Sequence, residues 1–168
     1  MAEGPQESQP PRTMPDIVKM EFEISIAAPV ELVWETMLDQ ESYRRWTEPF
    51  SVGSYYEGSW EEGEKMRFLG PGETGMLAVI AENRHLERLS IRHIGMVVEG
   101  VEDTTSEAVT SWAPAHESYS FARIPDGTRV TIEQEVLPGS EEQMEELWSA
   151  SLQKLKELCE SAGGEGSQ

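Results

Sequence analysis

Apolar and polar residues alternate along Phe22–Ile26, and this period of two is typical of a strand with one buried face. Pro29 follows shortly after, and proline suits the first position of a helix because its missing N–H is not needed there. We therefore predict a short helix from Pro29, and Asp39 offers the N-cap of a second one. The folded part of the chain is expected to begin with a strand that leads directly into two short helices.

The pattern in the middle of the chain predicts six antiparallel strands, because residues that favour turns separate six stretches rich in strand-forming residues. These turn signals are Gly58, Gly63, Gly70–Gly72 and Pro125–Gly127, and the last is typical of a hairpin. The predicted strands are Val52–Gly58, Lys65–Leu69, Gly75–Arg84, Arg88–Val97, Glu117–Ile124 and Thr128–Val136.

The segment from Gly95 to Pro114 is polar and long for a simple hairpin connection. Within it, Thr104–Glu107 fits a capping box, so a short helix is expected toward Trp112. Two interpretations stay open: the segment is a lid over a cavity, or it is an insertion with no gating role.

A long amphipathic helix is predicted near the C-terminal end, where apolar residues recur at helical spacing. Ser140 and Gln143 form a capping-box pattern, and Glu141–Glu142 lie where the helix dipole favours negative charge. Gly163–Gly164 are expected to end the helix. The apolar stripe consists of Met144, Leu147, Trp148, Leu152, Leu155, Leu158 and Cys159, with the small polar Ser151 within it.

A curved antiparallel sheet and one long amphipathic helix each have one apolar face, so they are expected to bury those faces against each other. We therefore predict an α+β fold: a strand, two short helices, six strands and a long C-terminal helix, with room for a cavity between sheet and helix. The domain is expected to span residues 17–160, between disordered tails at residues 1–16 and 161–168.

Six motifs follow one another along this domain: Ala27–Trp34, Tyr43–Trp46, Gly63–Phe68, Ile91–Gly95, Trp112 followed by Glu117–Tyr119, and Leu152–Leu158. Their order resembles the START-like, birch-pollen-allergen-like (SRPBCC) superfamily. Within it, the chain is similar to bacterial homologues of the C-terminal domain of the heat-shock-protein-90 ATPase activator. The resemblance covers nearly the whole domain and implies the helix-grip fold, in which a curved sheet wraps around the C-terminal helix.

The composition narrows the range of partners. Acidic residues number 32 and basic residues 13, a net charge of −19, so the surface repels nucleic acid and anionic lipid. The charge indicates a solvated surface, adaptation to a salty cytoplasm or a basic partner. The single cysteine excludes an internal disulfide, and the chain has neither a membrane-spanning apolar run nor a signal-peptide core. We expect a cytoplasmic protein that is not inserted in a membrane.

Four polar residues fall on strand faces that are otherwise apolar: His93, Glu117, Tyr119 and Gln134. Buried polar groups need hydrogen-bond partners, so one interpretation is that they satisfy one another, for example His93 with Gln134. The other is that they hold the polar end of a ligand in an apolar pocket. Together with apolar neighbours, the candidate cavity residues are Phe22, Ile24, Trp46, Met66, Phe68, Ile91, His93, Glu117, Tyr119, Gln134, Met144, Trp148 and Ser151.

Catalytic chemistry has little support in the sequence. The three histidines lack metal-ligand spacing, and Gly70–Gly72 lacks the lysine and helix of a phosphate-binding loop, so no metal or cofactor is expected. Cys159 lies in the helix stripe and is interpreted as an apolar filler. No catalytic residue is assigned, and binding is favoured over catalysis.

The superfamily includes carriers, cyclases and co-chaperone domains, so the resemblance implies three hypotheses. The first is a binding protein for a small hydrophobic molecule, lipid-like or aromatic, between the sheet and the C-terminal helix. The second is a co-chaperone-like domain that binds a chaperone or another protein. The third is a cyclase-like enzyme in which His93 and Glu117 form an acid–base pair.

Overall fold

The computed structural model describes residues 17–166, and the side chains of residues 17–162. The tail expected at residues 1–16 lies outside the described residues. In chain order the elements are β1 (Val18–Ile26), α1 (Val30–Leu38), α2 (Gln40–Trp46), β2 (Tyr55–Gly58), β3 (Lys65–Gly70), the 3-10 helix η2 (Pro71–Glu73), β4 (Thr74–Arg84), β5 (Arg88–Val98), β6 (Val101–Asp103), α3 (Glu107–Thr110), β7 (Ala115–Ile124), β8 (Gly127–Val136) and α4 (Glu141–Gly166).

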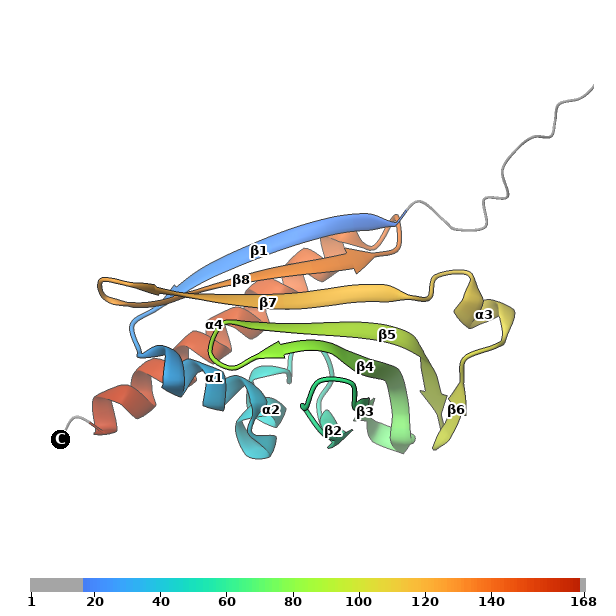
Figure 1. Ribbon diagram of the computed structural model, residues 1–168, viewed down its shortest axis with the longest axis horizontal. Coiled ribbons are helices and arrows are strands. Elements are labelled where there is room, and N and C mark those ends of the chain that lie inside the picture. Colours follow the sequence, from blue (N-terminus) through green and yellow to red (C-terminus); the bar gives the residue numbers. More distant parts are fainter. Residues whose placement is uncertain (1–16, 167–168) are drawn as a thin grey trace, which may run out of the picture.

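The strands form one antiparallel sheet in the order β1-β8-β7-β5-β4-β3-β2, and β6 pairs with the end of β5. The sheet curves around α4, which crosses behind it in Figure 1. The two short helices α1 and α2 connect β1 to β2 and pack against α4. This arrangement confirms the predicted α+β helix-grip fold.

All six strands predicted between residues 52 and 136 are present, and their ends differ from the prediction by at most three residues. The largest difference is at β2, which begins at Tyr55 because Val52 and Gly53 lie in a turn where Gly53 has a φ of +86°. The short strand β6 is absent from the prediction, which treated its segment as a polar connection. At the other end, α4 continues through Gly163–Gly164 to Gly166, so the expectation that these glycines end the helix is wrong.

The junction between β1 and the two short helices follows the prediction closely. Asp39 caps α2, since its carboxylate accepts a hydrogen bond from the Glu41 N–H at 3.2 Å. Pro29 is the N-cap of α1 and not its first residue, a shift of one position. Gly127, at the start of β8, lies against this junction with a φ of +154°, and a Cβ there would be 2.0 Å from the Ile26 carbonyl oxygen. The close crossing therefore requires glycine.

The start of α4 differs from the predicted capping box. The Ser140 hydroxyl donates to the Leu137 carbonyl oxygen at 2.6 Å, so it turns back toward the preceding loop. The Glu141 carboxylate accepts the Gly139 N–H at 2.7 Å. These two bonds order the approach to the helix, and Glu141 also keeps its charge at the positive end of the helix dipole.

The core lies between the concave face of the sheet and the apolar face of α4, and Trp148 is its central ring. Only 2 % of Trp148 is exposed. Its ring centroid lies 5.8 Å from that of Phe22 on β1, 6.2 Å from Trp46 on α2 and 5.1 Å from Phe50 in the loop after α2. Further along the predicted helix stripe, Leu152, Leu155 and Cys159 are buried as well.

A β-bulge interrupts the regular pairing of β4 with β5. The register shifts next to His93, which leaves Ile94 as an extra residue on β5. Because side chains alternate along a strand, the extra residue turns Met96 to the same side of the sheet as His93. Val97 then faces the opposite side, where it belongs to a separate apolar cluster.

The Trp148→Ala variant is expected to lose about 3–5 kcal/mol of unfolding free energy, because removing a buried indole leaves a cavity in the core. Urea denaturation followed by far-UV circular dichroism measures this loss. Ser149→Ala, at the next and exposed position of α4, is the control and should change the free energy by less than about 0.5 kcal/mol. A loss below about 1 kcal/mol for Trp148→Ala would show that the ring is not central to the core.

Candidate functional site

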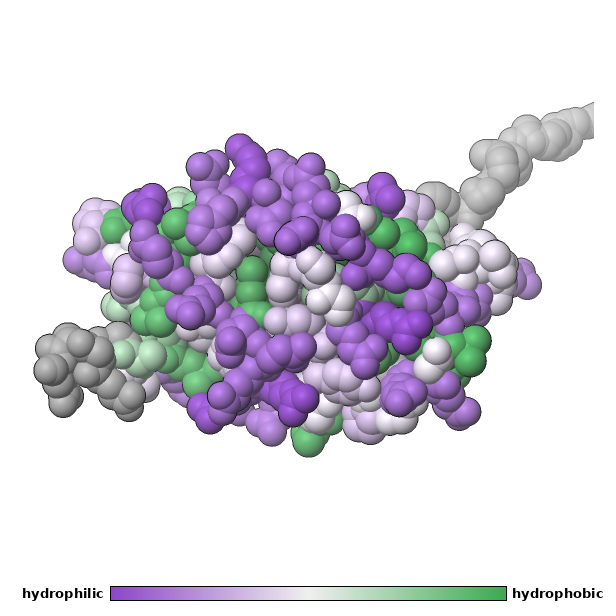
Figure 2. Space-filling view, turned by 60° about the horizontal axis from the view of Figure 1, so that its bottom comes forward, coloured by the Kyte–Doolittle hydropathy of each residue, from purple (hydrophilic) through white to green (hydrophobic). Residues whose placement is uncertain are grey.

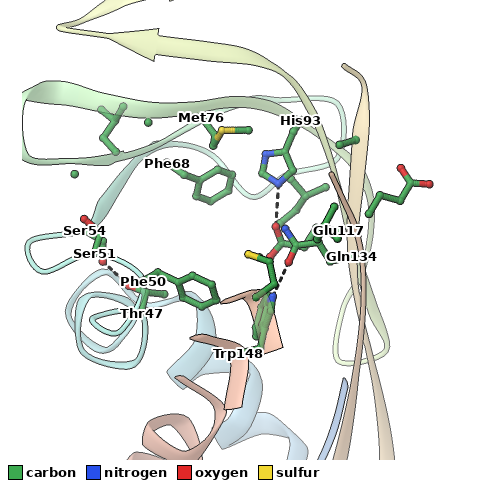
Figure 3. A pocket seen from close by; sticks show the side chains of 18 of the residues that line it. Thr47, Phe50, Ser51, Ser54, Phe68, Met76, His93, Glu117, Gln134 and Trp148 are labelled. Atoms are coloured by element: carbon green, nitrogen blue, oxygen red, sulfur yellow. Dashed lines mark hydrogen bonds and ion pairs between the residues drawn. The ribbon is translucent and has the colours of Figure 1, made fainter. Parts of the chain in front are cut away.

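A pocket of about 560 Å³ lies between the sheet, α2, α4 and the loop after α2 (Figure 3). Most of its lining residues are apolar or aromatic. The sheet contributes Phe68, Met76, Ile91, His93, Met96, Glu117, Tyr119 and Gln134. The two helices and the loop contribute Tyr43, Trp46, Thr47, Phe50, Ser51, Ser54, Met144 and Trp148.

Glu117 is the centre of a hydrogen-bonded network on the sheet side of the pocket. One carboxylate oxygen lies 2.9 Å from His93 Nε2, and the other accepts a hydrogen bond from the Tyr119 hydroxyl. The side chains of His93 and Glu117 are 9 % and 13 % exposed, so the pair is nearly withdrawn from water. Because a carboxylate only accepts hydrogen bonds, His93 donates through Nε2.

The second ring nitrogen of His93, Nδ1, is buried and has no hydrogen-bond partner among the described residues. With the hydrogen on Nε2, Nδ1 is an acceptor that lacks a donor. Buried polar atoms without partners are uncommon in folded proteins, and each one calls for an explanation. Because Nδ1 itself is buried, a bound molecule could donate to it only if the imidazole ring moved.

Two tyrosines of the pocket remain hydrogen-bond donors at ordinary pH. Burial raises the pKa of Tyr119 well above its usual value, and the charge of Glu117 raises it further. Burial likewise raises the pKa of Tyr43 on α2, and Glu117 again adds to the shift. Both phenols therefore keep their protons, and Tyr119 can donate to the carboxylate.

Gln134 and Trp148 link the sheet to α4 at the floor of the pocket. The indole Nε1 of Trp148 donates to Gln134 Oε1 at 2.5 Å. Glu117 and Gln134 are directly opposite each other on β7 and β8, so the two polar side chains share one face of the sheet. This register brings the carboxylate network next to the central indole of the core.

The loop after α2 forms the opposite wall. The hydroxyl groups of Thr47 and Ser54 are 2.5 Å apart and hold the two ends of this loop together. Between them, Phe50 packs edge to face on Trp148. In Figure 3 these residues face His93 and Glu117 across the pocket.

Nine of the thirteen candidate residues line this pocket, whereas Phe22, Ile24, Met66 and Ser151 do not. The nine are Trp46, Phe68, Ile91, His93, Glu117, Tyr119, Gln134, Met144 and Trp148. Phe22 stacks on Trp148, outside the pocket, and Ile24 packs against the core from the same strand. Met66 on β3 and Ser151 on α4 are both 0 % exposed, within the core.

Three of the four polar residues bond to one another, and the fourth, Gln134, bonds to a residue outside the group. His93 pairs with Glu117, and Gln134 pairs with Trp148, so His93 and Gln134 are not partners. A hydrogen bond between an imidazole and a carboxylate is charge-assisted, so it is stronger than one between an imidazole and the neutral amide of Gln134. This difference favours Glu117 as the partner of His93.

Several lining residues are absent from the sequence-based list, chiefly Tyr43, Phe50, Met76 and Met96. Tyr43 lies one helical turn before Trp46, so helical spacing would have placed both on one face. Met96 reaches the pocket through the bulge at Ile94, which the alternation of apolar residues does not reveal.

The segment from Gly95 to Pro114 contains the end of β5, then β6 and α3, so the predicted short helix is present. The predicted capping differs: Asp103 accepts the N–H groups of Thr105 and Ser106. Trp112, just after α3, lines the pocket. Whether this segment gates the pocket stays a prediction.

One face of the molecule is mainly hydrophilic (Figure 2). Figure 2 shows one face of the molecule, where hydrophilic residues predominate and hydrophobic ones form small separate groups. Several of the few basic side chains are paired: Arg67 and Lys65 both donate to Glu102, and these bonds lower the pKa of Glu102. Within the described residues, no helix is long and apolar enough to cross a membrane.

The described residues contain no group of three or more His, Cys, Asp or Glu side chains arranged to hold a metal ion. Cys159 is 0 % exposed and lies in the core away from the pocket lining, in agreement with its interpretation as an apolar filler. Burial raises the pKa of its thiol to about 11. The thiolate, which is the nucleophilic form, is therefore scarce at neutral pH.

Comparisons with known proteins agree with this geometry. A family model described as "Activator of Hsp90 ATPase homolog 1-like protein" matches residues 27–160, which confirms the resemblance that the motifs indicate. The comparison with curated proteins gave no significant match.

Solved structures share the fold at low sequence identity. Protein CV1439 from Chromobacterium violaceum is 20% identical with a TM-score of 0.60, over 85% of this chain and 98% of that one. An AHSA1-like protein from Aeromonas hydrophila is 18% identical with a TM-score of 0.58, over 87% and 94% of the two chains. DynU16, from the dynemicin biosynthetic locus, is 15% identical with a TM-score of 0.64, over 86% of this chain and 48% of that one.

The buried thiol of Cys159 is expected to make stability depend on alkaline pH. Its pKa is about 11 in the folded protein and about 9 in the unfolded chain, so between these values the unfolded state loses the proton first. The free energy of unfolding should therefore fall as the pH rises from 9 to 11, by about 2–3 kcal/mol in total from this group.

Urea denaturation of the wild type and of Cys159→Ala at several pH values isolates this contribution, because the other titrating groups are common to both. The stability difference between the two proteins should shrink as the pH rises. A constant difference from pH 8 to 11 would contradict the assignment of the shift to Cys159.

Proposed function

This chain belongs to the family of Activator of Hsp90 ATPase homolog 1-like proteins, and we propose that it binds a small, largely hydrophobic molecule in the pocket between the sheet and α4. The observation that carries the proposal is an apolar pocket with one buried polar network, that of His93, Glu117 and Tyr119. Sites for small molecules usually combine apolar walls with a few convergent polar groups.

The size of the pocket supports this function. Its volume of about 560 Å³ lies within the range of roughly 300–1,000 Å³ that is typical of sites for drug-sized ligands. A hydrocarbon or aromatic body would lie against Phe68, Met76 and Ile91. Its polar end would meet the donor hydroxyl of Tyr43 and the carboxylate of Glu117.

The similar structures give limited support for the kind of molecule. CalU16 from Micromonospora echinospora and DynU16 share the fold with this chain, and DynU16 belongs to the dynemicin biosynthetic locus. At 20% and 15% identity these likenesses concern the fold alone. An aromatic or polyketide-like ligand is compatible with the aromatic walls of the pocket, and a lipid-like ligand with its methionines.

The apolar area that a ligand can bury sets a limit on its expected affinity. A ligand that buries about 300 Å² of apolar surface gains on the order of 7 kcal/mol. Loss of translational and rotational freedom then removes several kcal/mol, so apolar contact alone predicts micromolar or weaker binding. Tighter binding would require hydrogen bonds with the polar network.

One observation favours a second function, proton transfer on the bound molecule. His93 Nε2 and Glu117 Oε1 are 2.9 Å apart and both side chains are largely withdrawn from water, which is the arrangement of an acid–base pair. In this case the hydrogen-bonded pair of His93 and Glu117 would exchange a proton with the ligand. The conversion of a bound molecule that His93→Gln abolishes would distinguish this function from binding alone.

Binding is tested by NMR titration of the isotope-labelled protein with neutral aromatic molecules, sterols and fatty acids. We expect saturable shifts for Tyr119 and the Trp148 indole with at least one class. The Met76→Trp/Met96→Trp variant fills the pocket from a cross-strand pair and should weaken that binding at least about tenfold. Val79→Trp places the same ring on the opposite face of β4 and is the matched control.

Saturable shifts that persist unchanged in Met76→Trp/Met96→Trp would place the ligand elsewhere on the protein. If no molecule of the panel causes a shift, the proposal fails and protein partners become the better hypothesis. Pull-down with a purified Hsp90-type chaperone then tests the co-chaperone-like alternative that the family name suggests.

A further inference from the structure

We propose that the pocket selects molecules with a positively charged nitrogen, such as a protonated amine on an aromatic or aliphatic body, and that it rejects carboxylates. The inference rests on the proposed function, because it names the ligand class of the same pocket. Two features carry it: a closed circuit of aromatic side chains, and a carboxylate with a side chain only 13 % exposed and with no Lys or Arg among the described lining residues.

The helix side of this circuit consists of three aromatic rings, which lead to a fourth ring on the sheet. The centroid of Trp148 lies 6.2 Å from that of Trp46, and Trp46 lies 6.0 Å from Tyr43. Tyr43 in turn lies 6.3 Å from Phe68 on β3. All four side chains line the pocket, so a ligand meets aromatic groups from α4 round to the sheet.

The sheet side closes the circuit and contributes a carboxylate to it. Phe68 lies 5.9 Å from the ring of His93, and Glu117 bonds to both His93 and Tyr119. The ring of Tyr119 then lies 6.0 Å from that of Trp148, where the circuit began. Six rings and one carboxylate thus enclose this part of the pocket.

The ionisable groups of the lining are unbalanced in sign. Glu117 and Glu135 are its acidic members, and His93 is the one basic side chain among the described lining residues. Glu135 is at the rim and its carboxylate bonds to the ring of His116 at 3.1 Å. The deep charge is therefore that of Glu117, whose partners are an imidazole and a phenol.

This arrangement treats cations and anions differently. A cation loses its hydration on entry, but the negative faces of aromatic rings and a nearby carboxylate replace it. A carboxylate ligand would lose its hydration and meet Glu117 with no Lys or Arg of the described lining to balance the two charges. In Figure 3, Phe50, Phe68 and Trp148 border the open part of the pocket together with Glu117.

The competing explanation is that Glu117 serves the fold alone, since both of its oxygens already accept hydrogen bonds. In that case the charge of a ligand would matter little. The net charge of −19 is another source of cation preference, because an acidic surface attracts any cation. Salt screens such surface effects far more than those of a buried carboxylate.

Three probes with the same naphthalene body separate these explanations: 2-naphthylmethylamine, 2-naphthylmethanol and 2-naphthoate. Isothermal titration calorimetry at pH 7 in about 0.5 M NaCl measures each affinity while the surface field is screened. We expect the amine to bind at least about tenfold more tightly than the alcohol, and the naphthoate at least about tenfold more weakly.

Glu117→Gln keeps the shape of the side chain and removes its charge, so the preference for the amine should fall to about threefold or less. Glu133→Gln makes the same change on β8 outside the pocket lining and should leave the preference intact. Phe68→Leu keeps an apolar side chain but removes an aromatic face. It should therefore weaken the binding of the amine more than the binding of the alcohol. If Glu117→Gln does not fold, Phe68→Leu still tests the proposal.

The outcomes are distinct. Equal binding of amine and alcohol, or tight binding of the naphthoate, would overturn the charge preference and leave the proposed binding function in place. A preference that survives in both Glu117→Gln and Phe68→Leu would also overturn it. If none of the three probes binds, this inference fails, whereas the proposed function fails only if the wider NMR panel also causes no shift.

Discussion

The packing of Trp148 joins the C-terminal helix to the sheet, and most of the architecture depends on that contact. Its ring meets aromatic side chains from β1, α2 and the loop after α2, while its Nε1 donates to Gln134 on β8. Hydrophobic burial is non-directional, but this hydrogen bond fixes the position of α4 along the strands. The same ring forms part of the pocket, so the core and the candidate site share a wall.

The polar network owes its geometry to strand register. Glu117 is opposite Gln134 on β8, and His93 reaches it from β5, the neighbour of β7 on the other side. The three adjacent strands β5, β7 and β8 therefore place the side chains of the network on one face of the sheet. A one-residue slip of β7 would move Glu117 to the outer face and leave His93 without its partner.

The sequence predicted the strands and nine of the lining residues because period-two and helical patterns determine which side chains face inward. Patterns of this kind do not report irregular pairing. The bulge at Ile94 reverses the alternation, so Met96 enters the pocket. Nor do they show how a loop folds, and Phe50 reaches the pocket from such a loop. Phe22 lies outside the pocket lining, because alternation identifies the face of a strand, whereas here the neighbouring indole of Trp148 packs against that face.

The short strand β6 has a consequence for the behaviour of the protein at high concentration. Strand β7 pairs with β5 only along Arg88–His93, so the last residues of β5 would otherwise present free N–H and C=O groups. β6 pairs with Met96–Val98 and occupies that edge. An unpaired edge is a template for strands of other molecules, and covering it suppresses aggregation. The edge at this point is now the three-residue strand β6, and so short an edge gives a strand of another molecule little to pair with.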